Sequence, residues 1–493
     1  MTPTATTTTG KIEGISSGGV RIFYGVPYAS PPVGDHRFAP PTPHDAWTGV
    51  RDCTRPGPTA PQFTRLFPQL DIAPLVGGGW QQGDDFLTTN IWAPESRGTR
   101  IPVMVFIHGG AFGLGSSYAT VTDGSAFARS GVICFSIHYR LGAEGFLPAA
   151  GIPANLGLRD ILFALQWVKE NAEAFGGDPE NITVFGESAG AMAIGDLLGS
   201  PLSKGLFQRA ILQSGHASMC REQQVAARVV QFLADFLKIE PNAAGFRSRS
   251  IAECVSAFEN LTQPTTRIDL RDANEMDSFF GMARLSPVLG DDVLPQKPLM
   301  AVANGAGKEV DVLIGTNREE MNLYFVPIGV RQTLTAPVAV AMLSASLPKA
   351  AEVLAAYGLG DSSLTAGEVF CTAMHDLTFR APARQLAAAH QGRTHVYELG
   401  WRSPACEGQL GACHGLELPF VFNTLSSCTG SNGIAGENPP QELADSTHAL
   451  WVAFAKDGSL PWPEFNANAR HVYSLETGTS AIEAPSIAEK YLL

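Results

Sequence analysis

The chain has 493 residues, with 34 Lys and Arg against 47 Asp and Glu, so its formal net charge at pH 7 is −13. This acidic balance argues against a nucleic-acid partner, because no cluster of basic side chains is available to neutralise phosphates. No run of eighteen apolar residues is free of interruption, so the sequence also predicts no membrane span.

The N-terminal segment and the cysteines indicate where the protein works. Residues 1–10 are mostly threonine, without a basic start or an apolar core, which is unlike a secretory signal. The eight cysteines lack the compact spacing of a disulfide framework: Cys53, Cys134, Cys220, Cys254, Cys371, Cys406, Cys413 and Cys428. We therefore expect reduced thiols and a cytoplasmic location.

The first predicted elements form a short antiparallel edge. Residues 9–26 predict two strands around the turn signal Ser17-Gly18-Gly19. Residues 56–83 are rich in proline and glycine and predict a long loop. Trp80 in this loop either covers a pocket or packs on the surface, and the sequence leaves both readings open.

Strands and helices alternate from residue 87 onward. Apolar runs typical of strands in a mainly parallel sheet lie at 87–92, 101–107, 132–137, 182–185, 210–213, 310–314 and 395–399. Between them, apolar residues from Leu158 to Val168 recur at helical spacing, and Gly176-Gly177-Asp178-Pro179 is expected to stop that helix. The pattern predicts an α/β fold with a mainly parallel central sheet.

A single domain is predicted over residues 1–493, because neither a linker nor an internal repeat is evident. Two mostly helical insertions, at about 221–282 and 338–390, interrupt the alternation. Active sites of open α/β sheets lie outside the carboxyl ends of the strands. The insertions are therefore expected to cap the active site and shape its pocket.

Residues 182–193 predict a nucleophile elbow. β-Branched and aromatic residues lead into Gly186-Glu187-Ser188-Ala189-Gly190, and small residues compatible with a helix follow. A serine at a sharp strand-to-helix turn has its hydroxyl pushed out of the sheet. We expect glycine at both flanks because the backbone must bend tightly there. Ser188 is the predicted nucleophile.

An acid and a base follow Ser188 in the order that an α/β hydrolase requires. The turn at 315–320 comes directly after a predicted strand and ends in Glu319 and Glu320, so it offers a carboxylate at the edge of the sheet. His414 lies in a glycine-flanked loop after the predicted strand 395–399. It is the predicted base.

A metal site is the alternative use of the His414 loop. Cys406, Cys413 and His414 lie close together in the sequence, but a fourth ligand at structural-zinc spacing is missing. We therefore expect neither a metal nor an organic cofactor.

A third motif, His108-Gly109-Gly110-Ala111-Phe112, directly follows a predicted buried strand. In lipases and esterases such a loop helps to build the oxyanion hole, because small residues leave its backbone amides uncovered. The amides of Gly110, Ala111 and Ala189 are predicted to donate to the developing alkoxide. A purely structural glycine-rich turn is the alternative.

With these motifs assembled, the chain resembles the type-B carboxylesterases, the carboxylesterase and cholinesterase family, and most of all their bacterial para-nitrobenzyl-esterase-like members. The resemblance covers nearly the whole chain and rests on segments 23–29, 31–34, 90–92, 139–142, 175–179, 186–190 and 411–422. It implies an α/β-hydrolase fold.

The resemblance also implies roles for individual residues. It assigns Ser188 as the nucleophile, Glu320 as the acid and His414 as the base, with Gly110, Ala111 and Ala189 in the oxyanion hole. It suggests that the Ser214 hydroxyl lies near this triad.

Two positions depart from the family pattern. Met321 stands where the family usually has glycine after the acid, so Glu319 stays open as the alternative carboxylate. Phe86 stands where secreted relatives have a cysteine, which agrees with a cytoplasmic location.

The sequence therefore predicts a serine carboxylic-ester hydrolase that forms an acyl-serine intermediate on a small-molecule ester. The Gly109-Gly110-Ala111 loop resembles the family pattern that accompanies bulky alcohol esters. We expect small to medium substrates such as aryl, phthalate-like or tertiary-alcohol esters, and a monomer or weak homo-oligomer. A non-catalytic cholinesterase-like binding protein is the alternative.

Overall fold

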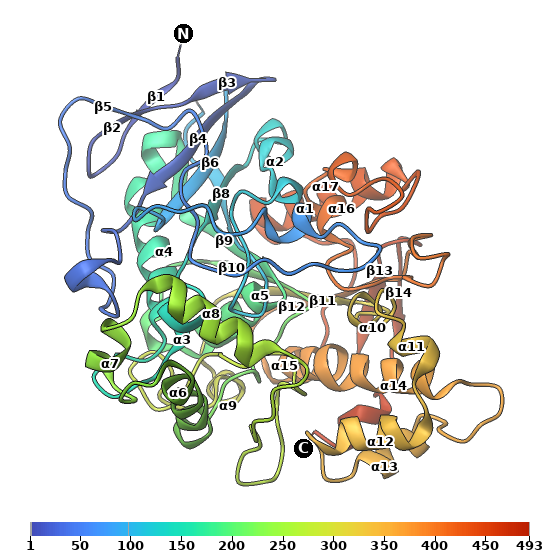
Figure 1. The fold of residues 1–493 in the computed structure, drawn as a ribbon. Coiled ribbons are helices and arrows are strands. Elements are labelled where there is room, and N and C mark those ends of the chain that lie inside the picture. Colours follow the sequence, from blue (N-terminus) through green and yellow to red (C-terminus); the bar gives the residue numbers. More distant parts are fainter. Residues whose placement is uncertain (1, 97, 493) are drawn as a thin grey trace.

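A computed structural model describes residues 2–96 and 98–492 (Figure 1). Within these residues eleven strands form one sheet in the order β14-β13-β12-β11-β10-β9-β7-β8-β6-β4-β3, and β1, β2 and β5 form a small second sheet. The strands are β1 Thr4–Thr6, β2 Lys11–Glu13, β3 Ile15–Ser17, β4 Val20–Pro27, β5 Val50–Asp52, β6 Thr88–Pro94, β7 Ile101–Ile107, β8 Ile133–Ile137, β9 Gly177–Glu187, β10 Arg209–Gln213, β11 Asp311–Asn317, β12 Thr394–Leu399, β13 His471–Ser474 and β14 Thr479–Ile482.

Helices flank the large sheet. They are α1 Ala73–Val76, α2 Ser125–Arg129, α3 Gly142–Phe146, α4 Leu156–Phe175, α5 Ala189–Gly199, α6 Gln223–Leu237, α7 Ala243–Arg247, α8 Ile251–Thr262, α9 Pro298–Ala303, α10 Asn322–Phe325, α11 Val330–Thr333, α12 Ala336–Ser344, α13 Ala350–Ala356, α14 Ala366–His375, α15 Ala381–Ala389, α16 Leu418–Val421 and α17 Gln441–Asp457. None of these helices is both long and apolar enough to cross a membrane.

The centre of the large sheet is parallel, which confirms the predicted fold class. Strands β8, β7, β9, β10, β11, β12 and β13 pair in parallel, whereas β3, β4, β6 and β14 pair antiparallel at the two edges. The register pairs Gln213 with both Glu187 and Gly315. The carboxyl ends of the central strands therefore meet along one edge of the sheet, where a site is expected.

All of the predicted strands are present, with small changes at their ends. The helix predicted around Leu158 is α4, and it ends at Gly176, whose φ of 96° satisfies the left-handed position that closes a helix. The prediction that Asp178 and Pro179 belong to this stop is wrong, because β9 already begins at Gly177. The C-terminal pair β13 and β14 was not predicted, because β14 is exposed along its whole length and carries no apolar pattern.

The side chains of β7 point alternately to the two faces of the sheet, and both faces are covered by helices. Val103, Val105 and Ile107 join a core with α4 and α5 on one face. Met104 and Phe106 join a second core with α2, α16 and α17 on the other face. Successive side chains of a strand point to opposite faces, so a run that is apolar at every position is buried on both sides.

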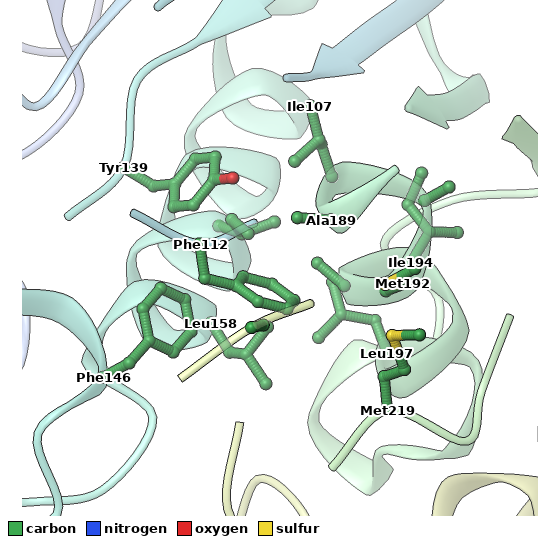
Figure 2. Packing of buried hydrophobic residues seen from close by; sticks show 14 of the residues in the cluster. Ile107, Phe112, Tyr139, Phe146, Leu158, Ala189, Met192, Ile194, Leu197 and Met219 are labelled. Carbon is green, nitrogen blue, oxygen red and sulfur yellow. The ribbon is translucent and has the colours of Figure 1, made fainter. Parts of the chain in front are cut away.

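The core on the α5 face also anchors a loop at the sheet edge (Figure 2). Phe112 is fully buried, and its ring lies 4.8 Å from that of Phe146, centroid to centroid. Figure 2 shows both rings close to Leu158, with the side chains of α5 beside them. Because Phe112 directly follows Ala111, this packing fixes the end of the predicted oxyanion loop.

The predicted insertions are mostly helical. Helices α6 to α8 lie within 221–282, and α13 to α15 with most of α12 lie within 338–390. A π-helical turn at Asp376–Arg380 joins α14 to α15 and places the Phe379 ring 4.7 Å from the ring of His414. Such turns recur at functional sites. All eight cysteines are unpaired thiols in the structure.

Candidate active site

The sequence around Ser188 forms the predicted elbow. Strand β9 ends at Glu187, helix α5 begins at Ala189, and Ser188 between them has φ 54° and ψ −124°. A positive φ in a residue with a side chain is uncommon and costs about 1–3 kcal/mol, so the surrounding structure must hold it. The amide of Ser188 donates to the Gln213 carbonyl oxygen at 2.9 Å, which ties the elbow to β10.

The two glycines of the motif are required for a reason other than the predicted one. Neither Gly186 nor Gly190 adopts a positive φ. Instead, a Cβ atom on Gly190 would lie 2.0 Å from the Ile107 carbonyl oxygen, and one on Gly186 would lie 2.8 Å from the same atom. Glycine is needed because α5 passes this close to β7, while the strained backbone belongs to Ser188 itself.

The structure brings Ser188, His414 and Glu320 together from three different strand ends. His414 Nε2 lies 2.8 Å from Ser188 Oγ, and His414 Nδ1 lies 2.6 Å from Glu320 Oε2. All three residues are buried. With Nδ1–H donating to Glu320, the lone pair on Nε2 faces the serine hydroxyl, which is the tautomer that a general base needs.

Glu320 rather than Glu319 faces His414. Glu320 Oε1 accepts hydrogen bonds from the Ser214 hydroxyl and from the Asn317 amide, both at 2.7 Å. Glu319 points elsewhere: it forms an ion pair with Arg402 and accepts from the Ala412 amide at 3.0 Å. The predicted position of Ser214 next to the acid agrees with this geometry.

Met321 fits where the family pattern has glycine. Its φ of −72° and ψ of −12° are right-handed helical values that any residue adopts, and its side chain is fully buried. The substitution therefore leaves the turn register unchanged.

The predicted oxyanion donors lie beside Ser188. Gly110 and Ala111 follow β7 with φ of 110° and 54°, and Ala189 is the first residue of α5. Within the part of the chain that the structure describes, none of these three amides donates to a protein acceptor. Free amides at a helix N-terminus and in a strained loop are well suited to bind a negative oxygen.

Glu187 is a site residue that the sequence prediction missed. Its Oε1 atom lies 3.0 Å from His414 Nε2, and the side chain is buried. Burial raises the pKa of Glu187 to about 8. In the sequence it occupies an unspecified position of the elbow motif, and no pattern indicates that its carboxyl group turns toward the base.

The carboxyl groups around His414 also change its protonation. Burial alone disfavours the imidazolium, but the charges of Glu187 and Glu320 outweigh burial and raise the pKa of His414 above its usual value. A third buried carboxyl group, Glu417, accepts from the Asn317 and Gln213 side-chain amides behind the triad. His414 is thus surrounded by carboxyl groups.

Both ring nitrogens of His414 are engaged by Ser188 and Glu320, so the ring offers no free ligand atom to a metal. Among the described residues, no cluster of three or more His, Cys, Asp or Glu side chains has the geometry of a metal site. The arrangement of Cys406, Cys413 and His414 therefore gives the metal alternative no support.

Ser188 opens into a cavity of about 90 Å³. Its walls come from the segment 65–76, which includes α1, from the oxyanion loop, from α10, and from the His414 loop with the start of α16. The wall is mostly apolar: Phe67, Ile72, Leu75, Val76, Phe106, Leu114, Leu323, Tyr324 and Leu418. Trp80 is not among the described residues that line it. Among the described residues, neither predicted insertion lines this cavity, so their expected role in shaping the pocket is not seen in its wall. Phe379 of the second insertion packs against the ring of His414.

Comparison with known proteins gives one consistent result. The model of the carboxylesterase family matches residues 1–491. The para-nitrobenzyl esterase of Bacillus subtilis (strain 168) is 36% identical over 487 residues, covering 96% of this chain and 94% of that protein. The phenmedipham hydrolase of Pseudarthrobacter oxydans is 33% identical over 496 residues, covering 94% and 93%.

Solved structures agree with the sequence comparisons. A thermophilic para-nitrobenzyl esterase superposes with a TM-score of 0.85 at 32% identity over 100% of both chains. A carboxylesterase of Geobacillus stearothermophilus superposes with a TM-score of 0.82 at 32% identity over 97% of both chains.

Proposed function

Because the chain belongs to the carboxylesterase family and is a carboxylic ester hydrolase, we propose that it works through an acyl-enzyme intermediate on Ser188. The observation that carries this proposal is the continuous hydrogen-bonded path from Ser188 Oγ through His414 to Glu320. The complete triad and the uncovered amides of the oxyanion loop make a purely binding role the weaker alternative.

In the proposed mechanism, His414 Nε2 takes the proton of the Ser188 hydroxyl as Oγ attacks the ester carbonyl carbon. The amides of Gly110, Ala111 and Ala189 stabilise the oxyanion, and Glu320 holds the imidazolium. His414 then returns the proton to the departing alcohol, which leaves an acyl-Ser188 ester. Water repeats the sequence, releases the carboxylic acid and restores the serine.

A partition experiment tests for the acyl-enzyme. Several acetate esters with different alcohols are hydrolysed in the presence of methanol, and the ratio of methyl acetate to acetate is measured. A common acyl-Ser188 intermediate gives the same ratio for every leaving group. Direct attack of water on the substrate would instead give ratios that change with the leaving group.

The carboxyl groups around His414 are expected to shift the pH dependence of hydrolysis. His414 must be neutral to act as a base, and an unperturbed imidazole titrates near 6.5. Because the pKa of His414 is raised, kcat/KM should rise with pH through a midpoint above 6.5. Replacing Glu187 by Gln removes one of the raising charges, so the midpoint should move to lower pH.

The Glu187→Gln profile is compared with that of Glu319→Gln, whose carboxyl group is paired with Arg402 and does not contact His414. The control should keep the wild-type midpoint. An unchanged or higher midpoint in Glu187→Gln would show that Glu187 does not act on the base.

We further propose that the substrates are small to medium esters, including aryl, phthalate-like or tertiary-alcohol esters. The carbonyls of the oxyanion loop support this scope. The Gly110 oxygen accepts from the Gly113 and Leu114 amides at 3.0 and 2.9 Å, and the Gly109 oxygen contacts His108 Nδ1 at 2.9 Å. Both oxygens are thus engaged within their own segment, which leaves room for a branched alcohol.

Hydrolysis of tert-butyl acetate is therefore expected alongside that of n-butyl acetate. The measurement is kcat/KM for both esters under the same conditions, with the acetate released determined by titration. Rapid turnover of the n-butyl ester with no detectable turnover of the tert-butyl ester would contradict the proposed room in the alcohol pocket.

The remaining proposals concern organisation and location. We propose one domain over residues 1–493, since strands from both ends of the chain join one sheet. We propose a cytoplasmic enzyme, which the eight unpaired thiols support. The expected state is a monomer or a weak homo-oligomer.

A further inference from the structure

We propose that Arg65 makes this esterase selective for esters that carry a second, ionised carboxyl group. The candidate substrates are half-esters of short dicarboxylic acids and esters of hydroxybenzoic acids. This inference rests on the proposed role of Ser188, because Arg65 acts on a substrate held in the same cavity.

Arg65 lines the cavity that contains Ser188 and His414. Among the described residues its guanidinium has neither a hydrogen bond nor an ion pair, and its one specific contact is with the Phe67 ring, whose centroid lies 5.2 Å away. By contrast, the buried Arg140 is paired with Asp160 at 2.6 Å. A guanidinium binds a carboxylate through two parallel hydrogen bonds, so this free group is suited to an anionic ligand.

The carboxyl groups nearest the nucleophile are engaged with His414 and not with Arg65. Glu187 Oε1 lies 3.0 Å from His414 Nε2, so its charge acts first on the imidazole. Glu320 lies beneath His414 and is paired with it. Most of the remaining wall is apolar, whereas Arg65 is exposed to solvent at the rim, so its selectivity would rest on the paired hydrogen bonds of the guanidinium rather than on burial.

Arg65 also lines an adjoining cavity of about 160 Å³, which Asp71 lines as well. The Asp71 carboxylate would repel an anion there, so we place the substrate carboxylate on the Ser188 side of Arg65. Arg65 and Ser188 line the same small cavity of about 90 Å³, so a compact substrate that carries both an ester and a carboxylate suits it best. The overall charge of −13 acts over longer distances and is largely screened at physiological salt.

Two matched ester pairs test the proposal, because the structure does not favour the acyl over the alcohol side. Monoethyl terephthalate is compared with ethyl benzoate, which puts the carboxylate in the acyl part. 4-Acetoxybenzoate is compared with its methyl ester, which puts it in the leaving group. For each pair the ratio of kcat/KM, anionic over neutral, is measured in wild type, Arg65→Gln, Arg65→Lys and Arg100→Gln.

Arg100 is the matched control for loss of one positive charge. It precedes β7 and therefore lies at the edge of the sheet opposite Ser188, where its exposed guanidinium pairs with the buried carboxylate of Asp178 at 2.9 Å. Arg65→Gln removes a charge-assisted hydrogen bond to the substrate carboxylate. The anionic-over-neutral ratio of kcat/KM should therefore fall about tenfold or more for at least one ester pair. Arg65→Lys should retain part of the preference, and Arg100→Gln should retain all of it.

The neutral esters separate this proposal from the proposed function. Their kcat/KM should stay at the wild-type value in Arg100→Gln and should fall less than that of the anionic esters in the Arg65 variants, whose fold is checked by circular dichroism, whereas Ser188→Ala should lower it about a millionfold. The selectivity proposal is overturned by equal ratios in wild type and Arg65→Gln, by an equal fall in Arg100→Gln, or by wild type that cleaves neither anionic ester. Neutral hydrolysis that stays near the wild-type rate in Ser188→Ala would instead overturn the proposed function.

Discussion

Replacing Ser188 by alanine is expected to lower kcat about a millionfold, as in serine hydrolases where loss of the nucleophile has been measured. The variant keeps the free amides of Gly110, Ala111 and Ala189, so about 10³–10⁴ of acceleration over water should remain. Steady-state kinetics with 4-nitrophenyl acetate measures the loss, and circular dichroism checks that the fold is retained.

Ser214 supplies the matched control, since it is also a buried serine at the end of a central strand. Its hydroxyl donates one of two hydrogen bonds that Glu320 Oε1 accepts. Ser214→Ala should therefore cost only about tenfold, the typical contribution of a hydrogen bond to a charged group. Comparable losses in both variants, or retained turnover in Ser188→Ala, would be incompatible with Ser188 as the nucleophile.

Replacing Glu320 by glutamine is expected to cost about 10⁴ in kcat, by analogy with an amide in place of a triad carboxylate. The Ser214 hydroxyl and the Asn317 amide would hold the oxygen of the new side chain at the place of Glu320 Oε1, because both groups donate there. The NH₂ group would then face His414 Nδ1 and favour the tautomer whose Nε2 carries the proton. That tautomer cannot accept the proton of Ser188.

Glu319→Gln is the control at the neighbouring position. Its side chain is bound to Arg402 and to the Ala412 amide, so its loss should change kcat by less than about tenfold. Measuring kcat of both variants under the same conditions shows which of the two carboxyl groups is the triad acid. A larger loss at Glu319 would reassign the acid by one residue.

Much of this architecture could be predicted from local sequence. Buried parallel strands such as 101–107 are apolar at every position because helices cover both faces, and this continuous pattern is easy to recognise. The three chemical motifs each follow such a strand. Since parallel strands end at one edge, their order along the chain predicts that Ser188, His414 and a carboxylate from the turn at 315–320 meet there, and the choice of Glu320 over Glu319 came from the family resemblance.

Other features depend on distances that no local pattern encodes. Gly186 and Gly190 match a turn motif, but they must be glycine because a side chain at either position would collide with β7, about eighty residues earlier in the chain. Glu187 and Arg65 are single charged residues without periodicity, and only the folded chain places them on the same cavity as Ser188. The proposed preference for anionic esters depends on Arg65, which is why sequence alone could not suggest it.

Covalent labelling with a fluorophosphonate tests the central proposal most directly. The enzyme is incubated with the probe, residual esterase activity is followed, and the modified peptide is identified by mass spectrometry. We predict one adduct per chain on Ser188, formed in step with the loss of activity and absent from Ser188→Ala. Loss of activity without modification of Ser188, or an active enzyme whose Ser188 is fully labelled, would contradict the proposed mechanism.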